Sequence, residues 1–184
     1  MKTRLSLREE LKKRTIVADG AMGTMIQTAN PSLEDFENLE GCNEILNITR
    51  PDLIKEVHRK YLSVGCDAIE TNTFGANLAN LAEYDIADRI YELAYAGGKL
   101  AREVADEFED TKWVLGSIGP GTKLPTLGHV EYEVLRSAYF ECAKGLVDSG
   151  VDALLIETAQ DLLQAKAAVV AAREAIDKSE RDVL

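Results

Sequence analysis

Near its N-terminus the chain reads Ile16-Val17-Ala18-Asp19-Gly20-Ala21-Met22-Gly23-Thr24, an apolar run that ends in a carboxylate and continues into glycines. This pattern predicts a buried strand that carries Asp19 at its C-terminal tip, where the backbone turns sharply. Aspartate disfavours strands and is costly to bury without a partner, so its position suggests a functional role. The alternative at this point is that Asp19 only caps the turn through neighbouring backbone amides.

Three later segments repeat an apolar run with a polar or glycine-rich end, at residues 66–74, 113–121 and 151–158. Helical patterns lie between and after them, at residues 49–65, 76–108, 129–150 and 161–178, the second broken at Tyr84-Asp85. A polar connection without regular structure is expected over residues 27–47. Near-continuous apolar strands that alternate with amphipathic helices predict an α/β fold with a parallel sheet covered by helices.

Composition narrows the class of protein. The chain has 184 residues, 46% of them apolar, and a net charge of −11, which disfavours nucleic acid and anionic membranes as partners. No apolar run approaches the roughly 20 residues of a membrane span. The charged N-terminus has no apolar signal-peptide core, which predicts a cytoplasmic location. Three widely spaced cysteines without a C-x-x-C pair predict free thiols in such a chain. His58, on the first long helix, is expected to be polar and partly exposed.

The spacing of the strands predicts an incomplete barrel. A closed (β/α)8 barrel needs about 250 residues, and the chain reaches Leu184 where a fifth strand would begin. Residues 15–184 are therefore expected to form the first four β/α units of a (β/α)8 TIM-type barrel, with parallel strands and outer helices. Residues 1–14 form a charged, helical lead-in. A self-contained four-stranded α/β sheet is the alternative.

Ligands of such folds bind beyond the carboxyl ends of the strands. Two carboxylates, Asp19 and Glu157, are expected at that edge and suit a small cationic group such as the ammonium of an amino acid. The amides of Gly20 to Gly23 suit its carboxylate. A phosphate ligand is disfavoured because the chain contains neither G-x-x-x-x-G-K-[ST] nor G-x-G-x-x-G.

Five short motifs then occur in order along the chain. They are Asp19-Gly20-Ala21-Met22-Gly23-Thr24-Met25, Asn47-Ile48-Thr49-Arg50-Pro51, Glu70-Thr71-Asn72-Thr73-Phe74-Gly75-Ala76, Gly116-Ser117-Ile118-Gly119-Pro120 and Ile156-Glu157-Thr158. Together they resemble the homocysteine S-methyltransferase family, in particular the homocysteine-binding N-terminal module of cobalamin-dependent methionine synthases. The resemblance runs from about Arg14 to Leu184, and the betaine–homocysteine methyltransferases share it more loosely.

The resemblance implies a barrel that binds homocysteine and a catalytic zinc, which lowers the pKa of the homocysteine thiol so that a thiolate attacks a methyl group. The methyl group would come from cobalamin on a separate module, recharged by methyltetrahydrofolate on a folate-binding module. Asp19 and Glu157 match the residues that hold the amino group. The implied substrate-binding set also includes Gly20, Ala21 and Met22, whose amides meet the carboxylate, and Asn72, Thr73 and Ser117 at the mouth.

The chain departs from the family pattern at the metal. The zinc ligands of the family are three cysteines in the second half of the barrel, and Cys42, Cys66 and Cys142 match none of them. No catalytic residue and no metal ligand is therefore assigned within this chain. It is expected to bind neither zinc nor cobalamin by itself and to be inactive alone.

Three other interpretations stay open. The chain could be a half-barrel folding or assembly unit without catalysis, and the exposed edges of its outer strands would then favour self-association. It could serve a betaine- or S-methylmethionine-type homocysteine methyltransferase. An aldolase-type lyase would need a Schiff-base lysine, and neither Lys123 nor Lys144 is expected at a strand tip.

Overall fold

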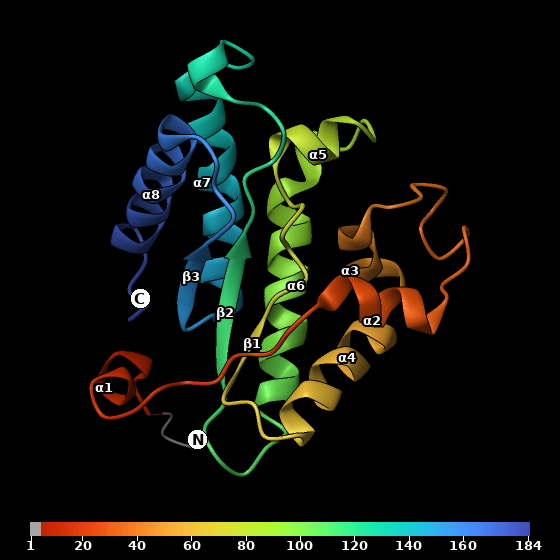
Figure 1. Ribbon diagram of the computed structural model, residues 1–184, viewed down its shortest axis with the longest axis vertical. Helices are drawn as coiled ribbons and strands as arrows, with labels where there is room; N and C mark the ends of the chain where they lie inside the picture. Colours follow the sequence, from red (N-terminus) through yellow and green to blue (C-terminus); the bar gives the residue numbers. More distant parts are fainter. Residues whose placement is uncertain (1–4) are drawn as a thin grey trace.

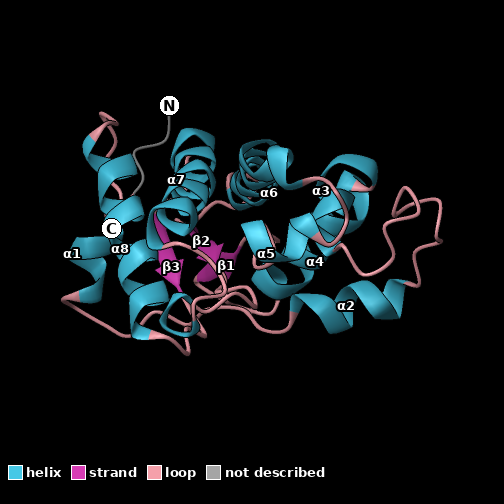
Figure 2. Ribbon diagram, turned by 90° about the horizontal axis from the view of Figure 1, so that it is seen from above, coloured by secondary structure: helices cyan, strands magenta, loops and turns pink. Residues whose placement is uncertain are grey.

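A parallel sheet lies at the centre of the structure, a computed structural model that describes residues 5–184. Its strands are β1 (Ala68–Glu70), β2 (Trp113–Ile118) and β3 (Ala153–Ile156), in the order β1-β2-β3. The register pairs Ala68 with Trp113 and Leu115 with Ala153. Figure 1 shows the strands side by side, and Figure 2 shows helices α6 and α7 together on one side of them. The predicted α/β class with parallel strands is confirmed.

The long helices among the described residues alternate with these strands as the sequence predicts, and shorter helices lie between them. They are α1 (Leu7–Leu11), α2 (Met22–Ala29), α3 (Leu46–Thr49), α4 (Pro51–Ser63), α5 (Leu78–Ala82), α6 (Ile90–Ala105), α7 (Tyr132–Ser149) and α8 (Leu162–Asp177), with 3-10 turns η1 (Asn43–Ile45), η2 (Ala87–Arg89) and η3 (Pro125–Leu127). The expected break at Tyr84-Asp85 separates α5 from α6, and Asp85 has a φ of 58°. Proline begins α4, where its missing N–H has no helical partner to lose.

The first expected strand is an extended segment with a single parallel bridge, between Ala18 and Ala68. Asp67 N–H donates to the Val17 carbonyl at 2.8 Å, and Asp19 N–H donates to the Ala68 carbonyl at 3.0 Å. The segment therefore lies beside β1 in the place of a first strand. It is shorter than expected because the Asp67 carboxylate takes the Val17 N–H, at 2.9 Å, and the backbone turns away at Gly20.

The connection expected over residues 27–47 is more ordered than its composition suggests. Helix α2 begins at Met22 and ends at Ala29, so the glycine-rich turn after Asp19 leads directly into a helix. Ile26 anchors that helix in a small core with residues of α3 and α4. Turn η1 and helix α3 follow before α4. The prediction of an irregular connection is wrong for these parts because one buried side chain and several distant contacts, rather than periodicity, hold them.

Side chains along each strand point alternately to the two faces of the sheet. Ile69, Val114 and Ile118 face the helices and belong to the main core. Ala68, Trp113 and Ala153 face the other way and pack with Leu7 of α1, which covers the amino end of the sheet. Within the expected lead-in of residues 1–14, only Leu7–Leu11 form a helix, and residues 1–4 lie outside the described residues. Continuing the same alternation puts Glu70, Ser117 and Glu157 on one face at the carboxyl end.

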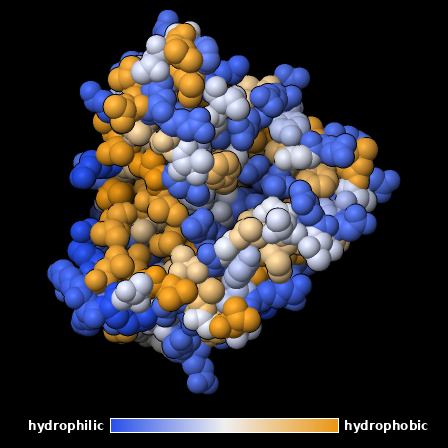
Figure 3. Space-filling view, viewed as in Figure 1, coloured by the Kyte–Doolittle hydropathy of each residue, from blue (hydrophilic) through white to orange (hydrophobic). Residues whose placement is uncertain are grey.

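The outer edge of β3 is where the next strand of a barrel would lie. Leu184 N–H donates to the Asp152 carbonyl and Leu154 N–H donates to the Leu184 carbonyl, both at 3.0 Å. A groove of about 360 Å3 runs between β3 and α8, lined by apolar side chains that include Ile156 and Val169. Figure 3 shows a hydrophobic band on this side of the molecule. Self-association through this edge stays a prediction.

His58 differs from its prediction. It is fully buried, burial lowers its pKa to about 4, and neither ring nitrogen has a hydrogen-bond partner. The three cysteines are free thiols, as expected. Burial raises the pKa of Cys42 to about 11 and that of Cys142 to about 12. No helix within residues 5–184 is long and apolar enough to cross a membrane.

The pair Gly97-Gly98 in α6 allows close approach of the elements around it. A Cβ at Gly97 would lie 2.6 Å from Thr73 Cγ2, 2.8 Å from Asn47 Nδ2 and 3.3 Å from the Asn72 carbonyl oxygen. A Cβ at Gly98 would overlap the Ser149 hydroxyl. Helix α6 therefore packs directly against the loop that follows β1.

We expect Gly97→Ala to lower the free energy of unfolding by about 1–3 kcal/mol, because the added methyl overpacks a contact that includes backbone. Urea denaturation followed by circular dichroism measures the change. Lys99→Ala, on the exposed side of the same helix, is the matched control. Equal stability of Gly97→Ala and Lys99→Ala would contradict the close contact.

Candidate functional site

A cavity of about 430 Å3 opens at the carboxyl ends of the strands. Its lining brings together most of the predicted substrate-binding residues, namely Asp19, Gly20, Ala21, Met22, Asn72, Ser117 and Glu157. Thr73 is not among them, because its side chain is fully buried. The lining also includes Glu70, a candidate because it lies at the tip of the second expected strand, and Glu44, Thr71 and Phe74, which the sequence did not assign to the site.

Asp19 is held by a neighbouring strand rather than by its own turn. Its Oδ1 accepts a hydrogen bond from Glu70 N–H at 2.9 Å. Burial raises the pKa of Asp19 to about 7, and the negative charge of Glu70 adds to that rise, while the hydrogen bond from Glu70 N–H opposes it. The local turn-cap alternative does not describe the observed bond, because donor and acceptor lie 51 residues apart.

Two further carboxylates face the same cavity. Burial raises the pKa of Glu70, and the negative charge of Glu157 raises it further. Glu157 Oε1 accepts a hydrogen bond from the Ser117 hydroxyl at 2.5 Å. Among the residues that the structure describes along the lining there is no lysine, arginine or histidine. The electrostatics therefore favour a ligand that brings a positive charge between these carboxylates.

Glu44 is a fourth carboxylate that sequence reasoning missed. It is buried, its carboxylate accepts a hydrogen bond from Gly75 N–H at 2.7 Å, and burial raises its pKa. In the sequence it stands within a polar stretch and carries no motif of its own. The partner that fixes it lies 31 residues further along the chain, so no local signal could have placed it.

Asn72 ties the loop after β1 to η1 and α3. Its Nδ2 donates to the Asn43 carbonyl at 2.8 Å and to Asn47 Oδ1 at 3.0 Å, and Asn47 Nδ2 donates back to the Asn72 carbonyl at 2.8 Å. Both side chains are almost fully buried. The amide donors of Asn72 are thus already used, and its main contribution is to fix the wall of the cavity.

The N-terminus of α2 brings partial positive charge to the cavity, in contrast to the negatively charged carboxylates. This eight-residue helix begins at Met22, and its N-cap, Ala21, has no side-chain cap. The N–H groups of a first helical turn have no acceptor within the helix and carry partial positive charge. No acidic side chain lies in that turn. The arrangement suits a carboxylate, so one cavity offers a pole for an ammonium and a pole for a carboxylate.

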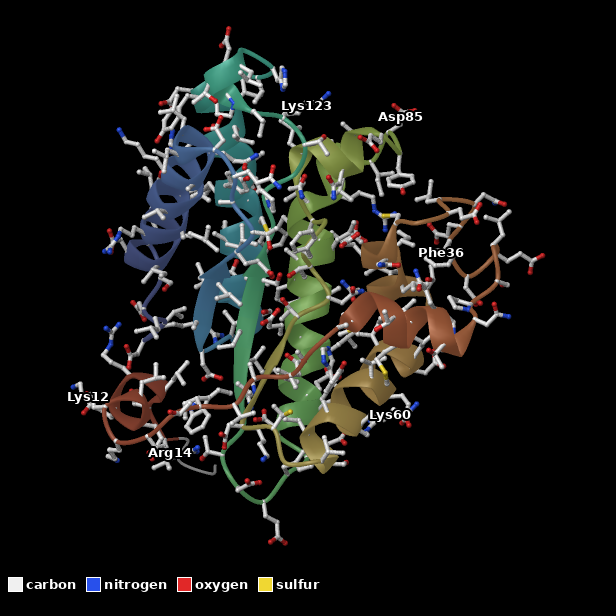
Figure 4. All side chains as sticks on the ribbon, in the orientation of Figure 1. Lys12, Arg14, Phe36, Lys60, Asp85 and Lys123 are labelled. Carbon is white, nitrogen blue, oxygen red and sulfur yellow. The ribbon has the colours of Figure 1, made fainter. Side chains whose placement is uncertain are left out.

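The lysines considered for a Schiff base lie elsewhere. Lys123 is exposed on the loop before η3, at the periphery in Figure 4, and does not line the cavity. Lys144 Nζ, on α7, pairs with Asp148 at 2.9 Å. Arg14, near the amino end of the strands in Figure 4, binds the Asp67 carboxylate with both terminal nitrogens. The lyase interpretation has no support at this site.

Comparisons with known proteins agree with this geometry. Residues 16–182 match the homocysteine S-methyltransferase family. The chain is 57% identical over 180 residues to methionine synthase of Mycobacterium tuberculosis (strain ATCC 25618 / H37Rv), and 56% identical over 180 residues to that of Mycobacterium leprae (strain TN). Each alignment covers 96% of this chain and 15% of the relative, so the chain spans about 15% of the length of these relatives.

Solved structures show the same fold. The metallated form of the homocysteine methyltransferase MmuM from Escherichia coli superimposes with a TM-score of 0.76 at 24% identity, over 94% of this chain and 64% of that one. The oxidized form gives 0.75 at 23% identity, over 94% and 63%. The chain therefore has the architecture of part of a barrel of this type.

The raised pKa of Asp19 predicts how stability depends on pH. Its pKa in the folded protein, about 7, exceeds the ordinary aspartate value of 3.8. At a pH between these two values, Asp19 is therefore protonated in the folded protein and ionised in the unfolded chain. We expect wild type to lose stability relative to Asp19→Asn as the pH rises across this interval, by at most about 1.4 kcal/mol per pH unit. Urea denaturation at several pH values measures it.

The matched control for that series is Glu83→Gln, at an exposed position of the surface. Asparagine at position 19 can still accept the hydrogen bond from Glu70 N–H, so the comparison isolates the charge. A difference between wild type and Asp19→Asn that stays constant from about pH 4 to 8 would contradict the raised pKa.

Proposed function

The chain belongs to the homocysteine S-methyltransferase family, and on that premise we propose that its cavity binds homocysteine for a methionine synthase reaction. The observation that supports this most is the pairing of opposite poles in one cavity. Asp19, Glu70 and Glu157 offer acceptors to an ammonium, and the first turn of α2 offers donors to a carboxylate. An α-amino acid carries both groups on one carbon, so both poles can be used at once.

The names of the relatives favour a methionine synthase over a betaine- or S-methylmethionine-dependent enzyme. The two mycobacterial relatives compared above are methionine synthases, and they are far more similar to this chain than the solved methyltransferase. We therefore propose that cobalamin- and folate-binding modules of a longer polypeptide deliver the methyl group, while this part holds its acceptor. The free thiols of the chain fit the reducing environment of the cytoplasm.

The residues of this chain do not fit a catalytic zinc. No group of three or more His, Cys, Asp or Glu side chains within residues 5–184 is placed to hold a metal. Cys42 and Cys142 are buried thiols whose pKa values are raised, so they are poor sources of thiolate ligands. Activation of the homocysteine sulfur is therefore assigned to residues outside this chain.

We expect the 184-residue chain to bind homocysteine and Asp19→Asn to bind it at least about 10-fold more weakly. The variant keeps an acceptor for Glu70 N–H but loses the charge that faces the ammonium, and a hydrogen bond to a charged group contributes about 1.5–3 kcal/mol. Isothermal titration calorimetry measures both affinities. A role for Asp19 in capping the turn alone would leave them equal.

Two analogues test each pole of the cavity separately. 4-Mercaptobutanoic acid lacks the amino group, and 3-aminopropane-1-thiol lacks the carboxylate. We expect both to bind more weakly than homocysteine to wild type, and only the amine-bearing analogue to weaken further with Asp19→Asn. Glu83→Gln is the control for charge alone. Loss of binding of the carboxylic analogue in Asp19→Asn would show that the assignment of the poles is reversed.

We also expect the chain alone to show no tight binding of zinc, because within residues 5–184 its three thiols do not converge and two are buried. Titration with zinc against a colorimetric chelator measures this. Tight one-to-one binding would contradict the assignment of the metal ligands to residues beyond this chain.

A further inference from the structure

A group of buried hydroxyls lies at the tip of β1, where Thr71 and Ser117 also line the cavity, and the proposed function gives this group no role. Thr71, Thr73 and Ser117 are between 0% and 3% exposed. Thr71 Oγ1 and Thr73 Oγ1 lie 2.6 Å apart. Thr73 Oγ1 donates to the Ser117 carbonyl at 2.7 Å, and Ser117 N–H donates to Thr71 Oγ1 at 3.0 Å. The two threonine side chains therefore bind both backbone groups of Ser117.

The direction of every proton in this group follows from the partners. A carbonyl only accepts, so the Thr73 proton goes to the Ser117 carbonyl. Thr73 Oγ1 must then accept from Thr71 in the bond between the two hydroxyls. Thr71 in turn accepts from Ser117 N–H. The Ser117 hydroxyl is left free of this ring, and it donates to Glu157 Oε1 at 2.5 Å.

The two threonine hydroxyls replace backbone groups of β1 as the hydrogen-bond partners of Ser117. The ladder between β1 and β2 pairs Glu70 with Leu115, and Thr71 N–H still donates to the Leu115 carbonyl at 3.0 Å. In a parallel sheet the next residue of β2 to face β1 is two positions on, at Ser117. Strand β1 has ended by then, so side-chain oxygens of Thr71 and Thr73 complete the pairing of Ser117.

We propose that Thr71 and Thr73 are positioning residues, which fix the backbone of Ser117 so that its hydroxyl holds Glu157 in the orientation that receives the ammonium of the ligand. This inference rests on the proposed function, because it needs an ammonium ligand at Glu157. Thr73 does not contact the ligand. It acts through Ser117, and Ser117 acts through the carboxylate.

Two substitutions separate the hydroxyl of Thr73 from its methyl. Thr73→Val keeps the branched shape that packs against Gly97 and loses the hydroxyl. Thr73→Ser keeps the hydroxyl and loses the methyl. We expect Thr73→Val to weaken homocysteine binding about 10-fold in calorimetry, and Thr73→Ser to restore an affinity within about twofold of wild type. The reverse order would show that packing rather than the hydroxyl matters, and would overturn the proposal.

A double-mutant cycle tests whether Thr73 acts through Ser117. Ser117→Ala removes the hydroxyl that reaches Glu157 and leaves the backbone bonds of Ser117 intact. We expect Ser117→Ala alone, and Ser117→Ala combined with Thr73→Val, to show the same loss of about 10-fold. Losses that multiply to about 100-fold would show independent effects and would overturn the proposed route.

Circular dichroism and thermal melts establish that each variant is folded at the temperature of the titration. If Thr73→Val does not fold, Thr71→Val and Thr71→Ser replace the pair, and they are judged by the same double-mutant cycle with Ser117→Ala because Thr71 also lines the cavity. Absence of homocysteine binding by wild type would refute the proposed function itself. Wild-type binding that Thr73→Val leaves unchanged would refute only the positioning role.

Discussion

The hydrogen bond from Glu70 N–H to the Asp19 carboxylate is the contact on which the cavity depends. The bridge between Ala18 and Ala68 sets a parallel register, in which the Glu70 N–H would next seek a backbone carbonyl. The Asp19 side chain supplies that acceptor instead. The backbone is then free to turn away at Gly20 and to begin α2 at Met22. One carboxylate thus ends a strand pairing and opens the space that a ligand can fill.

Side-chain oxygens also replace backbone hydrogen-bond partners on the other side of β1, where it faces β2. There the hydroxyls of Thr71 and Thr73 complete the pairing of Ser117 after the strand has ended. Both arrangements satisfy buried backbone groups, which would otherwise be costly to leave unpaired. They also let β1 stop after Glu70 while β2 continues to Ile118. The cavity lies where the short strand leaves room.

Parts of this site were predictable because the ends of apolar strands can be recognised in a sequence. Asp19, Ser117 and Glu157 each follow such a run, and all line the cavity. Glu44 and His58 were not predictable, since each is a polar side chain that is buried at a position no local pattern marks. At the start of α8 the Asp161 carboxylate accepts hydrogen bonds from Leu163 N–H and Gln164 N–H, a local cap. The Gln164 side-chain amide instead donates to the distant Pro120 carbonyl at 2.7 Å, a contact that no local pattern indicates.

Helix α6 extends these constraints from the sheet to the outer layer. Gly97 lies against the Thr73 methyl and the Asn47 amide, and a side chain there would displace one or both. Asn47 holds the Asn72 carbonyl, and Thr73 holds the Ser117 carbonyl. Gly97, on a helix outside the cavity, therefore allows α6 to lie close to both α3 and the loop after β1, which forms a wall of the cavity. The packing of α6 at Gly97 and the orientation of the Glu157 carboxylate therefore depend on each other, because Thr73, in the loop after β1, contacts Gly97 and also binds Ser117.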